Sequence, residues 1–362
     1  MDGQSSTLEV MGVTPKFWKG RSVFLTGHTG FKGGWMALWL SQMGANVSGY
    51  ALDPPNTPNF FAENELEARL YKSTIGDLRD LFHLTEALKS AKPSIVIHMA
   101  AQPLVRESYR SPVDTFNTNV MGTVHLLEAV RQVATVEAVV VITTDKCYEN
   151  QEWLWSYREN DRLGGYDPYS SSKACAEIVT AAYRASFFDK SGIKLASTRA
   201  GNVIGGGDWA TDRLIPDFFR AMEKDEVLKI RSPHAVRPWQ HVLEPVGGYI
   251  QLAEQLILGG SAFNGAWNFG PEEVDAKPVS YVADYLCEKI NYAHWEIDPN
   301  PQLHEAGLLK LDSSKAKKHL NWRPKWSLET ALNATIDWHL AWKERQPMSK
   351  FSLQQIEKYL KS

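Results

Sequence analysis

The strongest constraint on the fold is a short apolar segment that runs directly into a glycine-rich turn and then into a helical pattern. Ser22–Thr26 predicts a strand, and residues 35–40 carry apolar side chains at helical spacing. Between them lie Gly27, Gly30 and Gly33. Such glycines permit a tight turn, close approach of a pyrophosphate to backbone N–H groups, and tight helix–strand packing. A plain turn is the alternative, but the flanking strand and helix favour a dinucleotide site.

The alternation of strand and helix continues along the chain. Further predicted strands cover residues 47–52, 94–98, 139–142, 195–199 and 267–270, and predicted helices cover residues 114–130, 169–188 and 242–258. Strands that alternate with helices form a parallel sheet with right-handed crossovers. We therefore predict an α/β fold, a doubly wound parallel sheet of Rossmann type with a smaller, mostly helical C-terminal lobe.

Changes in residue character suggest how the chain is divided. Residues 1–16 read as a flexible lead-in. The dinucleotide-binding domain is predicted to comprise residues 17–198 and 240–272. The substrate-binding domain is predicted to comprise residues 199–239, where arginines, prolines and tryptophans gather, and residues 273–362.

Five reactive side chains follow the predicted strand that has four consecutive β-branched residues: Thr144, Asp145, Lys146, Tyr169 and Lys173. A parallel strand delivers its last residues to the carboxyl edge of the sheet, where open α/β sheets bind ligands. Tyr169 and Lys173 are four residues apart, so they share one face of a helix. A hydroxyl, a carboxylic acid, amines and a phenol can together move protons and a hydride. We predict that this is the active site.

Acidic and amide residues near strand ends suggest further cofactor contacts. Asp53 lies about 20 residues beyond the glycine turn, where a carboxylate accepts both adenosine ribose hydroxyls and repels a 2′-phosphate. This favours NAD over NADP, although His28 and Lys32 could attract a phosphate. Asp77 is placed to meet the adenine amino group or to cap a helix. Asn119 is either a bridge to the backbone near Lys173 or a satisfied buried amide.

The segment after residue 200 offers a substrate site. Arg231 and Arg237 are candidates to clamp a diphosphate, because the guanidinium fork matches phosphate oxygens. A surface salt bridge is the alternative for each arginine. The complete predicted set of substrate-binding residues is Gln102, Asn202, Arg213, Leu214, Arg231, Arg237 and Gln240.

Composition excludes several classes of function. A net charge of −3 over 362 residues gives no electrostatic reason to bind nucleic acid or an anionic membrane. No apolar run reaches membrane-spanning length. Three cysteines without metal spacing fit a reducing compartment, so we expect a cytoplasmic protein with no metal site.

The quoted motifs resemble the extended short-chain dehydrogenase/reductase family. The run from Thr26 to Trp35, the Asp145-Lys146 pair and the loop from Glu152 to Ser170 are similar to the CDP-glucose branch of the nucleotide-sugar 4,6-dehydratases. The dTDP-glucose branch carries Asp-Glu where this chain has Asp145-Lys146. The resemblance implies an NAD cofactor, CDP-glucose as substrate, and a step toward the 3,6-dideoxyhexoses of bacterial surface polysaccharide. It also implies a homo-oligomer, a dimer or a tetramer, which pairs through helices near Asn119 and Tyr169.

The resemblance also implies the roles of individual residues. Tyr169, with a pKa lowered by Lys173, would take the C4 hydroxyl proton while Thr144 holds the C4 oxygen. Asp145 would donate to the departing C6 hydroxyl, and either Lys146 or Asp145 would remove the C5 proton. The complete predicted set of cofactor contacts is Gly27, Thr29, Gly30, Phe31, Lys32, Gly33, Asp53, Asp77, Leu78, Ala100, Ala101, Asn119, Thr143, Tyr169 and Lys173.

Two other functions stay open at this stage. A nucleotide-sugar 4-epimerase, or a 4,6-dehydratase for another nucleotide sugar, would share the fold, the cofactor and the Tyr169/Lys173 pair. An epimerase needs no acid and base for elimination and typically has small residues where Asp145 and Lys146 stand. A dinucleotide-sensing protein without catalysis would usually have lost the Tyr169/Lys173 pair or the glycine turn, and both are intact.

Overall fold

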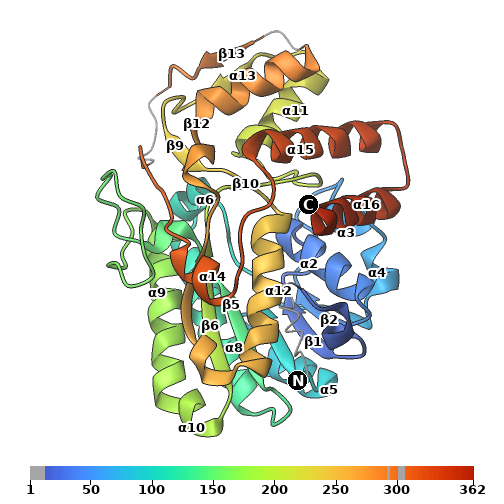
Figure 1. Cartoon of the computed structure of the whole chain (residues 1–362), viewed down its shortest axis with the longest axis vertical. Helices are drawn as coiled ribbons and strands as arrows, with labels where there is room; N and C mark the ends of the chain where they lie inside the picture. Colours follow the sequence, from blue (N-terminus) through green and yellow to red (C-terminus); the bar gives the residue numbers. More distant parts are fainter. Residues whose placement is uncertain (1–12, 292–293, 301–305) are drawn as a thin grey trace, which may run out of the picture.

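A seven-stranded parallel sheet forms the centre of the protein in the computed structural model, which describes residues 13–291, 294–300 and 306–362 (Figure 1). The strands of the sheet are β1 (Ser22–Thr26), β2 (Asn46–Ala51), β3 (Lys72–Ile75), β4 (Ile95–His98), β5 (Ala138–Ile142), β6 (Lys194–Ala200) and β11 (Gly265–Phe269). Their order is β11-β6-β5-β4-β1-β2-β3. The order reverses between β1 and β4, and ligands bind at such a switch point in open α/β sheets.

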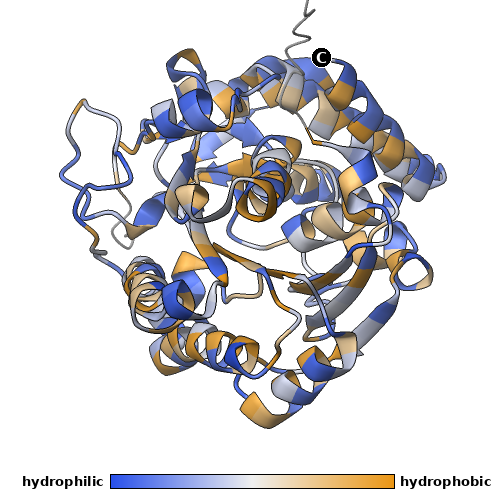
Figure 2. Ribbon diagram, turned by 60° about the horizontal axis from the view of Figure 1, so that its bottom comes forward, coloured by the Kyte–Doolittle hydropathy of each residue, from blue (hydrophilic) through white to orange (hydrophobic). Residues whose placement is uncertain are grey.

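Helices cover both faces of this sheet. The first-domain helices are α1 (Pro15–Trp18), α2 (Phe31–Gln42), α3 (Phe60–Glu63), α4 (Leu66–Arg69), α5 (Leu81–Ala91), α6 (Val105–Arg110), α7 (Pro112–Phe116), η1 (Asn117–Met121), α8 (Gly122–Arg131), η2 (Asp145–Cys147), α9 (Pro168–Tyr183), η3 (Arg184–Phe188), α10 (Asp189–Ser191), α12 (Leu243–Leu258) and η4 (Gly260–Phe263). Figure 2 shows apolar, orange strands in the middle of the molecule, with helices of mixed polar and apolar composition around them.

Successive side chains along the central strands point to opposite faces of the sheet and pack in two separate hydrophobic cores. In β1, Val23 and Leu25 pack in the core that contains α2 and α12, whereas Phe24 packs in the core that contains α5 and α8. In β5, Val140 packs in the first of these cores and Val139 packs in the second. Parallel strands buried on both faces are near-continuous runs of apolar residues, which is why these segments carry no polar alternation.

A smaller lobe stands above the carboxyl edge of the sheet, around α11, α13 and α15 in Figure 1. Its elements and the C-terminal ones are β7 (Val203–Ile204), α11 (Leu214–Lys224), β8 (Leu228–Ile230), β9 (Val236–Pro238), β10 (Gln240–His241), η5 (Glu273–Asp275), β12 (Ala276–Pro278), α13 (Val279–Ile290), β13 (Trp295–Ile297), α14 (Ser314–His319), α15 (Leu328–Lys343) and α16 (Met348–Lys361). The lobe has its own core, in which Phe218, Val282 and Leu332 are buried.

The last helix lies on the first domain. Tyr359 of α16 packs against Trp39 of α2, and its hydroxyl donates to Glu244 Oε2 at 2.8 Å. The predicted boundaries placed all of residues 273–362 with the substrate-binding domain, and that division stays a prediction. Through these contacts of Tyr359, α16 packs on the dinucleotide-binding half and stabilises it.

The predicted parallel sheet is confirmed, and so are the long helices. The helix predicted over residues 114–130 consists of α7, η1 and α8, and the one over residues 169–188 consists of α9 and η3. In both, a π-helical turn widens the helix, which no residue pattern indicated. The predicted lead-in lies outside the described residues up to residue 12, and α1 begins at Pro15. Among the described helices, none has both the length and the apolar composition to cross a membrane.

We predict that Gly33→Ala destabilises the protein by about 1–3 kcal/mol, the usual cost of overpacking. An added Cβ would lie 2.0 Å from the Gly27 carbonyl oxygen, so α2 would have to move away from the turn. At Gly30 the added atom meets the same oxygen at 3.4 Å, an ordinary contact. Gly30→Ala is therefore the matched control, and chemical denaturation of both variants measures the difference. Equal stability of the two would contradict this account.

Candidate active site

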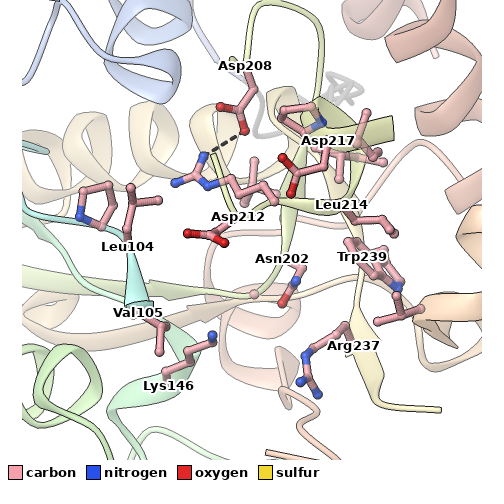
Figure 3. A pocket seen from close by; sticks show the side chains of 18 of the residues that line it. Leu104, Val105, Lys146, Asn202, Asp208, Asp212, Leu214, Asp217, Arg237 and Trp239 are labelled. Atoms are coloured by element: carbon pink, nitrogen blue, oxygen red, sulfur yellow. Dashed lines mark hydrogen bonds and ion pairs between the residues drawn. The ribbon is translucent and has the colours of Figure 1, made fainter. Parts of the chain in front are cut away.

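A cavity of about 290 Å³ lies between the carboxyl edge of the sheet and the smaller lobe (Figure 3). Its walls include residues that follow β1, β4, β5 and β6, together with α11, β8 and β9. Seven cationic and four anionic side chains line it. The excess of three positively charged side chains suits an anionic ligand.

Asp145 is the buried acid of this cavity. The Thr144 hydroxyl donates to Asp145 Oδ1 at 2.9 Å. Asp145 Oδ2 is buried, and it has no hydrogen-bond partner within the described part of the chain. Burial raises the pKa of Asp145, although the charges of Lys146, Arg237 and Lys32 oppose the shift. Gly201 leaves space beside this oxygen, because an added Cβ there would lie 3.1 Å from it.

Lys146 brings an amine to the same cavity. The residue belongs to the short helical turn η2 after β5, and it is half-buried. Figure 3 shows its side chain reaching into the cavity toward the region between Asp212 and Asn202. An acid and an amine from adjacent positions therefore face the same space.

Tyr169 and Lys173 are buried on the face of α9 that meets β5. Burial raises the pKa of Tyr169 to about 12, and contact with the Thr144 hydroxyl opposes the shift. The sequence predicted that Lys173 lowers the tyrosine pKa; in the protein without ligands, burial outweighs the Thr144 hydrogen bond and the charge of Arg213, so the pKa is raised. Burial and the charge of Lys32 lower the pKa of Lys173 to about 8, and its amine donates to the Ile142 carbonyl at 3.2 Å.

A buried charged network supports α9 from behind. Glu177 lies one turn beyond Lys173 and accepts hydrogen bonds from Thr143 Oγ1 at 2.5 Å, Ser197 Oγ at 2.7 Å and Arg199 at 2.8 Å. The side chains of Glu177 and Arg199 are each 3% exposed. The network ties α9 to β5 and β6 and so holds Lys173 and Thr144 in register. The sequence did not lead to a prediction of this network, although Ser197, Thr198 and Arg199 are polar residues of the buried strand β6 and were a signal for it.

We expect Glu177→Gln to lower the free energy of unfolding by about 3 kcal/mol, because it leaves the buried Arg199 charge without its partner. The matched control is Glu128→Gln on α8, where the partner Arg131 is 39% exposed. An exposed pair of this kind contributes about 0–1 kcal/mol. Chemical denaturation measures both, and a loss for Glu177→Gln no larger than that of the control would contradict a structural role.

The glycine turn fits a dinucleotide. Gly27 has φ +80°, and an added Cβ would lie 2.7 Å from the Ala100 backbone nitrogen, so β1 and β4 could not end so close together. At Gly30 an added Cβ would meet only the Gly27 oxygen within 4 Å. The helix α2 begins at Phe31 without a side-chain cap, so its first N–H groups are free of side-chain partners. Helix N-termini of this kind bind phosphates.

The predicted adenosine contacts lie where β2 and β3 end. Asp53 is exposed just after β2, and Thr29 Oγ1 donates to the Leu52 carbonyl at 2.8 Å. Asp77 is held by Arg79 in an ion pair of 2.6 Å, which lowers its pKa. Asp77 does not cap a helix, since the cap of α5 is Asp80.

The two residues that could have attracted a 2′-phosphate do not form such a site. His28 is buried, and its Nε2 lies 2.8 Å from Ser73 Oγ. Burial lowers the pKa of His28 to about 4, so the ring is uncharged at neutral pH. Lys32 lines the catalytic cavity together with Phe31.

Asn119 is a buried amide with both side-chain atoms hydrogen-bonded, and it also bridges two elements. Its Oδ1 accepts from the Gln102 N–H at 2.8 Å, and its Nδ2 donates to Ser172 Oγ at 2.9 Å. Ser172 precedes Lys173, so Asn119 joins the exit of β4 to the catalytic helix. Ala100 and Ala101 lie at that exit and are half-buried.

The remaining cofactor candidate, Leu78, is buried against Gly122 of α8.

The substrate candidates divide into two groups. Those that line the cavity are Asn202, Arg213, Leu214, Arg231 and Arg237. Gln102 and Gln240 do not line it. Gln102 uses its amide on Leu104 and Thr115, and Gln240 Nε2 donates to the Phe269 carbonyl at 2.8 Å.

Two of the candidate arginines form ion pairs, which for Arg231 is the alternative that the sequence left open. Arg213 pairs with Asp208 at 2.8 Å, and Arg231 pairs with Asp212 at 3.0 Å. Sequence analysis missed Asp208 and Asp212, which lie in the loop after Gly205–Gly207. It also missed Arg106. Asp208 follows the glycines directly, so its position in the sequence was a signal for a residue of this site. The ion pairs of Asp212, in contrast, depend on how β8 and α6 approach that loop.

No group of three or more histidine, cysteine, aspartate or glutamate side chains suited to a metal ion is present in the described ranges.

Comparison with known proteins gives close relatives. Residues 24–335 match the family described as GDP-mannose 4,6 dehydratase. The chain is 52% identical over 354 residues to the CDP-glucose 4,6-dehydratase of Salmonella typhimurium (strain LT2), which covers 96% of this chain and 98% of the relative. It is 25% identical over 337 residues to a dTDP-glucose 4,6-dehydratase of Xanthomonas campestris, covering 87% and 92% of the two chains.

Solved structures share the fold. The dTDP-glucose 4,6-dehydratase of Bacillus anthracis in complex with NAD superposes with a TM-score of 0.75 at 21% identity, covering 91% of this chain and 100% of the other. The UDP-glucose 4-epimerase of Thermotoga maritima with UDP-glucose gives a TM-score of 0.77 at 22% identity, with coverage of 89% and 99%. Similarity at this level establishes the architecture.

Proposed function

Because the chain belongs to the GDP-mannose 4,6 dehydratase family, we propose that it is an NAD-dependent lyase that converts CDP-D-glucose to CDP-4-dehydro-6-deoxy-D-glucose. The observation that carries this proposal is the buried Asp145, one oxygen of which has no hydrogen-bond partner among the described residues, beside Lys146 in the cavity that also contains Tyr169. An epimerase has no use for an acid and a base at these positions.

NAD would lie along the glycine turn and accept the C4 hydride of the sugar, then return it to C6, so it is unchanged after each turnover. Gly27, Gly30 and Gly33 provide the backbone approach for the pyrophosphate. Asp53 would accept the adenosine ribose hydroxyls, and the uncharged His28 supports NAD over NADP. The other proposed contacts are those of the predicted set at the exits of β1 to β5 and on α9.

In the first step Tyr169 removes the C4 hydroxyl proton while Thr144 holds the C4 oxygen. Lys173 supports the phenolate that this requires, since its positive charge lies one helical turn away. The phenol is protonated in the protein without ligands. We infer that the positive charge brought by the oxidised cofactor adds to that of Lys173 and lowers the tyrosine pKa.

In the second step the C4 ketone makes the C5–H bond acidic. Lys146, which must be in its uncharged amine form for this step, removes the C5 proton, and protonated Asp145 donates to the C6 hydroxyl, which leaves as water. The raised pKa of Asp145 favours the protonated form that an acid needs. Lys146 would give the proton back to C5 when the hydride returns from the bound cofactor to C6, so the net change is the loss of one water.

Substrate recognition is assigned to the arginine-rich side of the cavity. Arg213, Arg231 and Arg237 would bind the diphosphate, with Asn202 and Leu214 beside them. The preference for cytidine rests on the 52% identical relative. This substrate places the protein before the enzymes that form 3,6-dideoxyhexoses of surface polysaccharide.

We also propose a cytoplasmic homo-oligomer, dimer or tetramer. Cys147, Cys175 and Cys287 are free thiols, which suits a reducing compartment. The faces of α7 and α9 expose apolar side chains, among them Val113 at 71% and Ile178 at 57%. A partner subunit would cover such surfaces. The oligomeric state is measured by light scattering of the purified protein.

Incubation with CDP-, dTDP-, UDP- and GDP-glucose tests the function directly. We expect a keto sugar, detected by its absorbance in alkali, from CDP-glucose and with much lower kcat/KM from the others. Formation of a C4 epimer, or no keto sugar from any of the four, would contradict the proposal.

A further inference from the structure

A triad of charges crosses the cavity and joins the two halves of the protein. Asp212 Oδ1 lies 3.1 Å from Arg106 of α6 and 3.0 Å from Arg231, which directly follows β8. Arg106 belongs to the dinucleotide-binding half, and Arg231 belongs to the smaller lobe. Their side chains are 22–29% exposed, so solvent and ligands reach them.

The loop that carries Asp212 has a left-handed backbone at this residue. Asp212 has φ +61°, a conformation that is unfavourable for most residues other than glycine. Such backbone positions are typical of functional loops. Asp212 is one of the side chains that line the cavity (Figure 3). The two ion pairs place one anion between two guanidinium groups.

We propose that Asp212 is a displaceable stand-in for the substrate diphosphate, and that Arg106 is a diphosphate-binding residue beside Arg231. This inference rests on the proposed function and goes beyond it by adding Arg106 and a gate. A carboxylate and a phosphate present the same oxygen geometry to a guanidinium group, but a diphosphate carries more charge and more acceptors. On binding, the diphosphate takes both arginines, repels Asp212, and brings α6 and β8 together over the sugar.

The gate has a consequence for affinity. In the free protein the substrate must break two Asp212 ion pairs before it gains its own. Asp212→Asn removes that competition without changing the size of the side chain, and asparagine tolerates the left-handed backbone. We expect the Kd for CDP, measured by calorimetry in low salt, to fall about three- to thirtyfold. Arg106→Met is expected to raise the Kd about tenfold. In a protein that already carries Arg106→Met, Asp212→Asn should lower the Kd by a much smaller factor than it does alone.

Glu107→Gln on α6 is the matched control, because it removes one negative charge from a residue that pairs with Arg110 and does not line the cavity. It should leave the Kd for CDP unchanged. An unchanged or higher Kd in Asp212→Asn, or an unchanged Kd in Arg106→Met, overturns the gate. These results would leave the dehydratase proposal standing if wild-type protein still forms the keto sugar from CDP-glucose. Wild-type protein that neither binds CDP nor forms that product overturns both.

Discussion

Tyr169→Phe is expected to lower kcat for keto-sugar formation about 10³–10⁴-fold, which is the upper range for a single acid–base group. Without the phenol oxygen, the C4 hydroxyl has no group to take its proton, so the hydride cannot leave. The block comes before any chemistry at C5 or C6. We therefore expect neither reduced cofactor nor keto sugar in a single turnover, with nucleotide-sugar binding retained.

Tyr183→Phe is the matched control for this experiment. Tyr183 is on the same helix, but its hydroxyl donates to Glu128 Oε1 at 2.7 Å, far from the cavity residues. The control should keep wild-type kcat. Rapid-scan absorbance of the reduced cofactor separates the outcomes, and wild-type accumulation of reduced cofactor in Tyr169→Phe would remove this residue from the oxidation step.

The second large effect is expected for Asp145→Asn, with product formation lowered about 10²–10⁴-fold. Asparagine keeps the shape and can still accept from Thr144, but it cannot donate an acidic proton to the C6 hydroxyl. C4 oxidation should survive, so reduced cofactor should accumulate on the enzyme. The account also predicts that wild-type activity falls as pH rises through the raised pKa of Asp145, because only the protonated form acts as the acid.

Exchange at C5 separates the roles of the two neighbours. In deuterated water, Asp145→Asn should still exchange the C5 proton, because Lys146 is present, whereas Lys146→Met should oxidise C4 and show no exchange. Asp189→Asn, on the outer helix α10, is the control for loss of one carboxylate. Loss of exchange in Asp145→Asn with full exchange in Lys146→Met would make Asp145 the base and remove Lys146 from the mechanism.

The sheet could be predicted from the sequence because its strands are buried on both faces. Residues 139–142 are all β-branched, and such a run has few other stable placements. The strand over Ser22–Thr26 was predicted with its observed bounds. The catalytic constellation could be predicted for a related reason. Thr144 and Asp145 directly follow the end of β5, and Tyr169 and Lys173 lie one helical turn apart on α9, so each pair could be placed from local geometry, whereas the approach of α9 to β5 depends on tertiary packing.

The charged side of the cavity could not be predicted in the same way. Arg231 and Asp212 are 19 residues apart, and Arg106 and Asp212 are 106 residues apart, so their pairing depends on how the two halves of the chain pack. The raised pKa of Tyr169 also follows from burial, a tertiary property. Gln240, a polar residue in an arginine-rich segment, was predicted to bind the substrate. Its side chain instead donates to the backbone carbonyl of Phe269 in β11.

The central claim is that the hydride taken from C4 returns to C6 of the same sugar molecule, and one labelling experiment tests it most directly. CDP-glucose that carries deuterium at C4 is first mixed with an equal amount of unlabelled CDP-glucose, and the mixture is converted in ordinary water. The product is then analysed by NMR and mass spectrometry. We expect deuterium at C6 in the molecules that began with it, and no transfer to the unlabelled ones. Deuterium that is lost to solvent, remains at C4 or is shared between molecules would contradict the account.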